Sequence, residues 1–412
     1  MAGLATVREE VAITGIGLVT PAGIGIESNW ERICAGLPTA AHDPNLDGLP
    51  VAISCRVPDF DANALLGRRT AWRLDRVSQL ALVAAKEALD DAGLLPATWD
   101  GARVGVVLGN ALGGTGAYED AYAAMHQQGP AWVPPLVMVQ GPINMISGYI
   151  AMQCGALGPN LVVATACASG VTAIGTAREL LRSGACDIVL SGASEAPLAR
   201  MPMAAYSQMG ALSTRTDDPL RASRPFDVAR DGFVAAEGAA VLVLERVSDA
   251  RARGARVRAL VSGYGASADG HHASAPDPSG AGAERAMRAA LTDAGAAPEE
   301  VEHINAHGTS TELNDLTESR VIRRVFGDGP AVTSTKGVTG HALGAAGAIE
   351  AAYTALSVER GTVPPTANLE EQDPRIEIDV VVDKPRSLRI ERATCNSFGF
   401  GGQNAVLVIG AA

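Results

Sequence analysis

One pattern occurs twice in this chain, about 200 residues apart. In its first occurrence the Ala-rich segment Ala84–Gly93 leads to the apolar run Val104–Leu108. In its second, Ala286–Gly295 leads in the same order to His303–His307. Self-similarity at a fixed spacing is the sequence signature of a repeated structural unit. We therefore expect an internal duplication, with a ligand cleft between two similar halves.

Two further pairs of segments support the duplication. The strand-like segment Val11–Gly17 resembles Leu260–Gly265, and the Ala-rich helical pattern after Cys167 is matched by one after His341. Short apolar runs alternate with such helical patterns along the chain, which is typical of an α/β protein with mainly parallel strand pairing. The two halves are expected at residues 1–250 and 251–412.

The expected elements follow from these patterns. The candidate strands are short apolar runs: Val11–Ile16, Val104–Leu108, Leu161–Ala164, Asp187–Ser191, Ala239–Leu244, Arg258–Gly263, His303–Ala306, Ala331–Ser334, Ile376–Val381 and Ala405–Ile409. The candidate helices are Ser78–Ala92, Ala168–Ser183, Ala281–Ala294, Asn314–Phe326 and Ala342–Glu359. Two stretches that contain Gly or Pro, 129–135 and 214–225, are expected to be surface loops.

Charge and composition limit the classes of partner. The formal net charge of −12 argues against nucleic acid or an anionic membrane as the main partner. No run approaches 18 apolar residues, and no basic region precedes an apolar one at the N-terminus, so neither a membrane span nor a signal peptide is expected. The six cysteines show no CxxC spacing, so a disulfide framework is not indicated. We expect a cytoplasmic protein.

Cys167 is the first candidate for chemistry. It follows an apolar run and precedes three small residues, Ala168, Ser169 and Gly170, which let a helix start against a sheet. At a helix N-terminus the backbone N–H groups and the macrodipole stabilise a thiolate and lower its pKa. The same N–H groups can bind the oxyanion of a thioester under attack. The alternative is an inert buried cysteine, but the glycine-flanked turn favours a nucleophile.

Two histidines stand at matching places in the second half. His307 and His341 each lie beside a glycine at the end of an apolar run, where side chains point into an edge cleft. A thiol and two imidazoles are the parts of a cysteine-nucleophile acyl-transfer site. Zinc, with Cys167 as a third ligand, is the alternative. No local HxxxH or CxxC pairing supports it, so no metal site is predicted.

Lys336 is unusual in this chain because only three of the 33 basic residues are lysine. A lysine within a segment dense in glycine and histidine suggests a need for a compact ammonium rather than the planar fork of arginine. We expect it to pair with Glu350 and to orient a histidine through a hydrogen bond. The alternative is a surface ion pair, which contributes little to stability.

Four more side chains are candidates for substrate contact. Thr309 and Thr311 flank the His307 turn and offer hydroxyls to a polar chain such as an amide-bearing pantetheine arm, or else satisfy the backbone at a strand end. Phe398 and Phe400 alternate with glycines in a chain that has six phenylalanines. Bulky rings on a glycine loop are suited to gate an apolar pocket. A turn with packed aromatic rings is the alternative.

Taken together, these motifs resemble the elongating β-ketoacyl-acyl-carrier-protein synthases of the thiolase superfamily. The segments that carry the resemblance span the chain: Val11–Gly25, Thr165–Gly170, Ser223–Asp227, Arg230–Phe233, His307–Thr311, Lys336, Thr339–His341 and Asn396–Gly402. The chain departs from the pattern at Gln403, where Thr or His is common, and at Gly337 and Val338, where Ser and Met are common. These departures bear on the substrate and leave it open.

The resemblance implies a thiolase-like α/β fold, five-layered in the order αβαβα, and an acyltransferase that forms carbon–carbon bonds. Cys167 would take an acyl chain from the phosphopantetheine of a carrier protein. His307 and His341 would promote decarboxylation of malonyl-carrier protein and stabilise the enolate, which then attacks the acyl-enzyme. Lys336, held by Glu350, would tune His307.

The same resemblance implies an oxyanion hole from the N–H groups of Cys167 and Phe400, with Phe398 and Phe400 gating the pocket. It implies no separate cofactor, because the phosphopantetheine arm arrives with the acyl carrier protein. A homodimer or a heterodimer with a homologous subunit is expected.

Three alternatives stay open. One is a ketosynthase subunit of a type II polyketide or polyene synthase that works with a chain-length-factor partner. Another is a CoA-dependent, thiolase-like acyltransferase. The third is a non-catalytic partner subunit, against which the intact Cys167, His307 and His341 argue.

Overall fold

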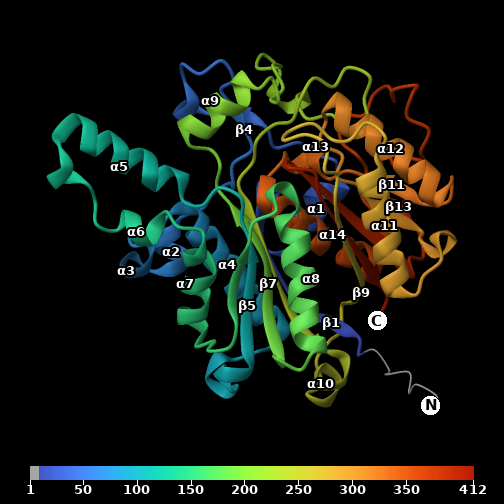
Figure 1. The fold of residues 1–412 in the computed structure, drawn as a ribbon, viewed down its shortest axis with the longest axis horizontal. Helices are drawn as coiled ribbons and strands as arrows, with labels where there is room; N and C mark the ends of the chain where they lie inside the picture. Colours follow the sequence, from blue (N-terminus) through green and yellow to red (C-terminus); the bar gives the residue numbers. More distant parts are fainter. Residues whose placement is uncertain (1–8) are drawn as a thin grey trace.

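A large mixed sheet forms the centre of the molecule (Figure 1). The computed structural model describes residues 9–412, and within that range ten strands lie in the order β11-β10-β14-β15-β9-β1-β8-β7-β5-β6. Their bounds are β1 Val11–Thr20, β5 Val104–Gly109, β6 Asn160–Val163, β7 Ile188–Glu195, β8 Gly238–Arg246, β9 Ala259–Ala268, β10 His303–Asn305, β11 Ala331–Thr333, β14 Arg392–Gly399 and β15 Gln403–Gly410. Short two-residue strands pair outside this order: β2 Gly23–Ile24, β3 Ala41–His42, β4 Ile53–Ser54, β12 Thr362–Val363 and β13 Arg386–Ser387.

The strand pairings repeat on either side of β1 and β9. In the N-terminal half β1 pairs antiparallel with β8 and β8 antiparallel with β7, after which β7, β5 and β6 run parallel. In the C-terminal half β9, β15, β14, β10 and β11 follow the same sequence of directions. The predicted duplication is therefore confirmed. The expectation of mainly parallel pairing is wrong, because each half begins with antiparallel pairs and β1 also meets β9 antiparallel.

Helices form three layers around the two sets of strands. On the N-terminal set the outer layer consists of α4 (Arg76–Ala92) and α7 (Asn144–Cys154). On the C-terminal set it consists of α11 (Ala281–Ala294) and α12 (Glu312–Phe326), which share one hydrophobic core. Between the sets lie α8 (Ser169–Arg182) and α14 (Ala346–Arg360), which contact each other and strands of both halves. The five-layered αβαβα fold is thus confirmed, with α8 and α14 as its central helices (Figure 1). Helix α8 begins just after Cys167 and α14 just after His341.

Glycine lets the outer helices approach the sheet closely, and it does so at equivalent places in both halves. A Cβ atom on Gly15 would lie 2.2 Å from the carbonyl oxygen of Ala88 on α4. A Cβ atom on Gly263 would lie 2.4 Å from the carbonyl oxygen of Ala290 on α11. The two Gly-X-Gly motifs of β1 and β9 therefore serve backbone packing, the role of glycine where helix and strand lie in contact.

The predicted elements match the structure where apolar periodicity is strong. The helix expected at Ala281–Ala294 has those bounds, and α8 and α4 begin within two residues of the expected positions. The strand expected at Ile376–Val381 is absent: that segment makes only an isolated bridge between Val380 and Val332. Conversely, β14 was not predicted as a strand, because the glycines at its end resemble a loop.

Several helices were not predicted. They are α1 Ile26–Cys34, α2 Ala62–Leu66, α3 Arg68–Ala71, α5 Thr115–Gln128, α6 Val137–Gln140, α7 Asn144–Cys154, α9 Arg200–Gln208, α10 Val247–Ala252 and α13 Lys336–Thr339. Helix α5 projects away from the body of the molecule (Figure 1), and its Tyr118, Tyr122 and Met125 are exposed rather than gathered on a buried face. No helix within residues 9–412 combines the length and apolar character needed to cross a bilayer.

Candidate active site

Cys167, His307 and His341 meet in one cavity of about 490 Å³. A ligand atom from each side chain lies within 4.8 Å of the corresponding atoms of the other two, and all three residues are buried. Cys167 comes from the N-terminal half and both histidines come from the C-terminal half, so the duplication builds the site between its halves. Thr309, Thr311, Phe398 and Phe400 also line the cavity, whereas Lys336 and Glu350 lie behind the histidines.

Cys167 sits on a sharp turn between β6 and α8. The preceding residue, Ala166, has a φ of 48°, a left-handed conformation that is uncommon for a residue other than glycine. A single 3₁₀ turn over Ala166–Ala168 then leads into the helix. The equivalent turn before α14 holds Leu343 at a φ of 43°. The strained turn points the thiol of Cys167 into the cavity, at the start of a helix.

Two effects on the Cys167 thiol oppose each other. Burial raises its pKa to about 11, from an ordinary value of 9.0, while Lys336 and the backbone N–H of Phe400 lower it. The N–H of Cys167 itself acts in the same direction as that of Phe400. The sequence-based expectation of a lowered pKa is therefore wrong in its net direction, because desolvation outweighs the N–H groups. The same two N–H groups can donate to the oxyanion that forms on a thioester carbonyl when the sulfur attacks it.

His307 is held at the end of β10 by bonds to its backbone. Its N–H and that of Gly308 donate to the two oxygens of the Glu318 carboxylate, each at 2.8 Å. Its carbonyl oxygen accepts from the Lys336 ammonium at 2.6 Å. Burial, and then the charge of Lys336, hold the pKa of His307 well below its ordinary value, so the imidazole is neutral near pH 7.

Glu318 is a functional residue that was not predicted from sequence. This residue is buried on α12, and besides the His307 turn it binds the side-chain amide of Asn396 at 3.1 Å. The available signal was a glutamate on the buried face of an otherwise amphipathic helix, where an unpaired carboxylate is costly.

His341 is fixed from the other half of the chain. Its N–H donates to the carbonyl of Val234, and its carbonyl accepts from the N–H of Ala236, at 2.8 Å and 3.0 Å. Its ring meets those of His307 and Phe233 edge to face. Burial and the charge of Lys336 keep the pKa of His341 well below its ordinary value, so it too is a neutral imidazole near pH 7.

Lys336 and Glu350 form an ion pair buried beneath the histidines. Their side chains are 1% and 2% exposed, so the alternative of a surface pair is excluded. Burial raises the pKa of the Glu350 carboxyl to about 7, and the Lys336 ammonium opposes that shift. Since the ammonium also bonds the carbonyl of His307, it places a fixed positive charge beside both imidazoles.

Four residues predicted to contact substrate form the rim of the cavity. Thr309 and Thr311 share a hydrogen bond of 2.9 Å between their hydroxyls. The ring of Phe398 lies 5.9 Å from that of His307, edge to face, and Phe400 is exposed at the turn between β14 and β15. All four residues line the same cavity as Cys167.

The thiol and two imidazoles also match the donor set of a metal site, but their surroundings do not fit a cation. The fixed charge of Lys336 lowers the pKa values of both imidazoles, and it would oppose a divalent cation in the same way. Within the described residues the Nδ1 atoms of His307 and His341 have no hydrogen-bond partner. Metal-bound histidines are normally oriented by such a partner. No step is therefore derived through a metal.

Comparison with known proteins gives consistent relatives along the chain. The family models "Beta-ketoacyl synthase, N-terminal domain" and "Beta-ketoacyl synthase, C-terminal domain" match residues 8–250 and 258–370. A 3-oxoacyl-[acyl-carrier-protein] synthase 2 of Synechocystis sp. is 41% identical over 407 residues, which cover 97% of each chain. The enzyme of that name from Staphylococcus aureus strain COL is 40% identical and covers 97% of this chain and 98% of the relative.

Solved structures agree with these relatives. The ishigamide ketosynthase/chain length factor superposes with a TM-score of 0.92 at 34% identity, covering 98% of this chain and 100% of that one. A type II PKS ketosynthase, bound to the hexaketide and in complex with its acyl-carrier protein, gives 0.92 at 33% identity with the same coverage. A β-ketoacyl synthase from Burkholderia phymatum gives 0.91 at 34% identity, also with that coverage.

Proposed function

This chain belongs to the β-ketoacyl synthase family, and from that premise we propose that Cys167, His307, His341 and Lys336 carry out its reaction. The enzyme is a 3-oxoacyl-acyl-carrier-protein synthase, an acyltransferase that condenses malonyl-carrier protein with an enzyme-bound acyl chain and releases carbon dioxide. The observation that carries the assignment of roles is the convergence of one thiol and two neutral imidazoles within 4.8 Å in one cavity.

The first half-reaction moves an acyl chain onto Cys167. Because the thiol has a pKa of about 11, it must lose its proton as the sulfur attacks the incoming thioester carbonyl. The neutral imidazole of His341 accepts that proton. The N–H groups of Cys167 and Phe400 stabilise the oxyanion, and collapse of the tetrahedral intermediate expels the pantetheine thiolate, which takes the proton back.

The second half-reaction forms the carbon–carbon bond. The imidazole N–H groups of His307 and His341 donate to the thioester oxygen of malonyl-carrier protein, so the electron pair of the breaking carboxylate bond can move into an enolate as carbon dioxide leaves. The enolate carbon attacks the acyl-Cys167 carbonyl, and the cysteine sulfur departs as a thiolate and takes up a proton from solvent. Neutral imidazoles suit both half-reactions. A neutral imidazole can donate an N–H to the enolate oxygen in this step and can accept the Cys167 proton in the first half-reaction.

The remaining predicted residues position the substrate. Thr309, Thr311, Phe398 and Phe400 line the cavity that holds Cys167, and the two threonine hydroxyls are hydrogen-bonded to each other. In this proposal the hydroxyls bind an amide-bearing pantetheine arm. The rings of Phe398 and Phe400 are suited to gate the acyl pocket. The phosphopantetheine arm comes with the substrate, so the proposed mechanism uses no separate cofactor.

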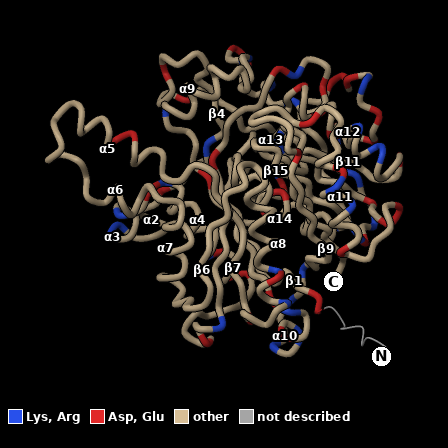
Figure 2. The backbone as a smooth tube through the Cα atoms, viewed as in Figure 1, with Lys and Arg blue, Asp and Glu red and all other residues tan. Residues whose placement is uncertain are grey.

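A carrier protein is the proposed donor of both substrates. Helix α3 and the turn after it carry three exposed arginines, Arg68, Arg69 and Arg73, and the exposed side chain of Trp72. The blue of basic residues is visible at α3 (Figure 2). In a chain with a net charge of −12 this cluster forms a basic surface that suits an acidic carrier. The solved ketosynthase in complex with its acyl-carrier protein is a precedent from a related protein.

We also propose that the chain pairs with a second copy or a homologous subunit along β6. This strand is at one end of the sheet, and its Leu161 is exposed. Further large apolar side chains are exposed on α5, on the short 3₁₀ helix Pro130–Trp132 and on α6: Tyr122, Trp132 and Met138. An unpaired strand edge beside apolar surface is a template for association with another chain. The ketosynthase/chain length factor pair among the similar structures is a precedent for the heterodimeric form.

The proposal is tested by intact mass spectrometry. The protein is mixed with a carrier protein that bears a medium-length acyl chain, next to Cys167→Ala, and malonyl-carrier protein is then added. We expect an acyl increment on the wild type, none on the variant, and then carbon dioxide with a product two carbons longer. Acylation from acetyl-CoA without carbon dioxide release would instead identify a thiolase-like acyltransferase. Absence of an increment would contradict a stand-alone enzyme.

A further inference from the structure

The turn that carries His307, residues His307–Thr311, is held in place by residues 224–232 from the other half of the chain, here called the pinning segment. Ser310 in this turn has a φ of 68°, a left-handed conformation for a residue that is not glycine. Its carbonyl accepts from the N–H of Gly232 at 3.1 Å, and its hydroxyl accepts from the N–H of Arg224 at 2.9 Å. Such backbone strain persists only where the surroundings hold it in place.

The pinning segment is itself strained at the point of contact. Phe226 has a φ of 66°, which is exceptional for a bulky side chain, and its residue is fully buried. Its N–H donates to Asp315 on α12 at 2.9 Å, and a Cβ atom on Gly308 would lie 3.1 Å from the end of its ring. The Phe226 ring therefore supports the turn directly beside His307.

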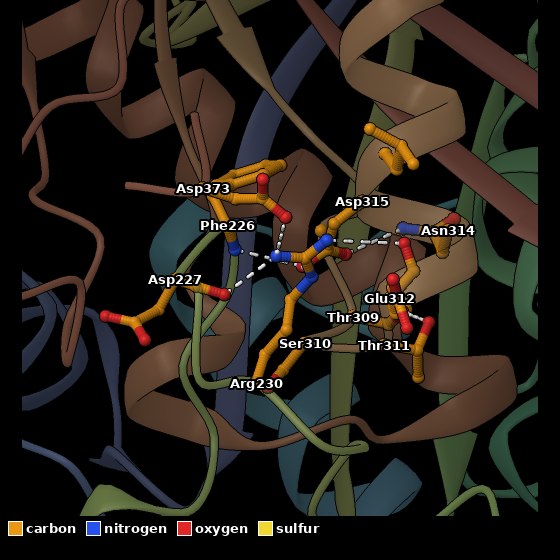
Figure 3. Close-up of polar contacts among 12 residues, drawn as sticks. Phe226, Asp227, Arg230, Thr309, Ser310, Thr311, Glu312, Asn314, Asp315 and Asp373 are labelled. Carbon is orange, nitrogen blue, oxygen red and sulfur yellow. Dashed lines mark hydrogen bonds and ion pairs between the residues drawn. The ribbon is translucent and has the colours of Figure 1, made fainter. Parts of the chain in front are cut away.

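Arg230 joins the two strained elements (Figure 3). One of its terminal nitrogens donates to Asp373 at 2.9 Å and to the carbonyl of Asp227 at 2.7 Å. The other donates to the carbonyl of Glu312 at 3.4 Å, and the Nε atom lies 3.6 Å from the Asp315 carboxylate.

This ion cluster is almost completely removed from water. The side chains of Arg230, Asp315 and Asp373 are 1%, 0% and 1% exposed. Asp315 binds the N–H groups of Phe226 and Thr309, so its carboxylate touches both the pinning segment and the pinned turn. Arg230 also lies in the wall of the cavity that holds Cys167. Buried ion clusters contribute little net folding stability, because desolvation of the charges offsets their attraction. Removal of one member leaves an unpaired buried charge, so such a cluster is suited to hold the surrounding backbone in one conformation.

We infer that Arg230 is a positioning residue: with Asp315 and Asp373 it clamps the His307–Thr311 turn against the 224–232 segment, and it thereby sets the place of the His307 imidazole. This inference rests on the proposed roles of Cys167 and His307. The clamp does not contact Cys167, which belongs to the turn after β6. Its loss should impair the His307-dependent decarboxylation and condensation while sparing acylation of Cys167.

The test separates the two half-reactions in Arg230→Gln. Acyl transfer from a medium-chain acyl-carrier protein is followed by intact mass, and carbon dioxide release from malonyl-carrier protein is followed on the preformed acyl-enzyme. Because a misplacement of about 1 Å can cost about 100-fold in rate, we expect carbon dioxide release to fall by about that factor while acylation changes by less than about 3-fold. Arg230→Lys, which keeps the charge but not the planar fork, should recover part of the loss.

Arg375→Gln is the matched control. Arg375 binds the same Asp373 carboxylate, at 2.6 Å, but from the exposed side, and its bonds go to that carboxylate and to the Glu312 side chain rather than to the turn. We expect both half-reactions of this variant within about 2-fold of the wild type. Asp373→Asn removes the inner partner of Arg230 and should reproduce the selective loss.

The outcomes are distinct. If both half-reactions of Arg230→Gln fall together, or neither falls, Arg230 does not position His307 and the inference is overturned. If Arg230→Gln does not fold, the same comparison in Arg230→Lys and Asp373→Asn decides. If the wild type neither acylates nor releases carbon dioxide, the proposed function fails rather than the clamp.

Discussion

Burial disfavours the thiolate form of Cys167, the proposed nucleophile. A thiol whose pKa is raised to about 11 is protonated near neutral pH, so reactivity depends on transfer of its proton to an adjacent neutral imidazole during attack.

Alkylation of Cys167 by iodoacetamide should therefore be slow at neutral pH. The thiolate forms as pH rises through the pKa, so we expect the rate constant to increase continuously from pH 7 to pH 10 with no plateau in that range. The rate is measured by intact mass, with Cys167→Ala as the control for the other five cysteines. A plateau near pH 7 to 8 would mean a thiolate stabilised in the resting enzyme.

Burial and, after it, the charge of Lys336 lower the pKa values of both histidines and keep them neutral near pH 7. The positive charge of Lys336 disfavours a second one on the imidazoles, so Lys336→Met should raise those pKa values. Decarboxylation then loses its neutral imidazoles at a higher pH, and the acid limb of its pH–rate profile should move upward. The variant also leaves Glu350 buried without a partner, which costs about 3–5 kcal/mol of unfolding free energy. An acid limb that stays in place would contradict this account.

The residues of the site were more predictable than their environment. The motif around Cys167 and the glycines beside His307 and His341 identify turns at strand ends, which is information local in sequence. The sign of the pKa shift on Cys167 depends on how much protein covers the thiol, and the clamp at Arg230 depends on contacts between segments about 80 and 140 residues apart. Neither can be read from local pattern.

The two halves repeat the same elements, and individual glycines occupy equivalent positions in both. Gly17 and Gly265 lie under α4 and α11, where added Cβ atoms would come within 1.8 Å and 2.2 Å of helix carbonyl oxygens. Helix prediction succeeded for α11 because its apolar residues lie on one buried face. It failed for α5, whose large apolar side chains are exposed, and the alternation of glycine with bulky residues concealed β14.

Gly17→Ala should destabilise the protein, because the strand and α4 must separate to admit a methyl group. Overpacking of this kind costs typically about 1–3 kcal/mol. Gly148 on α7 is the matched control: nothing lies within 4 Å of its hypothetical Cβ atom, so Gly148→Ala should be neutral or stabilising by up to about 1 kcal/mol. Urea unfolding of both variants measures the difference. Equal stability would mean that the close approach is not required.

For the whole molecule, the duplication explains why the chemistry is divided between halves. Each half contributes a turn before a central helix, the first with Cys167 and the second with His341, and the packing of α8 against α14 brings these turns together. The order of motifs predicted this arrangement. Pairing with another subunit was predictable only from the resemblance to the family, because the sequence of β6 does not distinguish an edge strand from an internal one.

Association should depend on the β6 edge. We expect the wild type to sediment at about twice its 42.1 kDa chain mass, alone or only after addition of a homologous subunit. Leu161→Asp places a charge on the edge and should leave a 42.1 kDa monomer. Analytical ultracentrifugation distinguishes these cases, with Leu37→Asp, another exposed leucine outside the proposed interface, as the control. A Leu161→Asp variant that still pairs would place the interface elsewhere.

The most direct test of the central claim is single-turnover carbon dioxide release from malonyl-carrier protein on enzyme already acylated at Cys167, for the wild type and His307→Ala. The account predicts that His307→Ala acquires the acyl chain but releases carbon dioxide at least about 100-fold more slowly, because an N–H donor to the developing enolate is lost. Equal rates of release in the two proteins would contradict the role of His307 and with it the division of chemistry between the two halves.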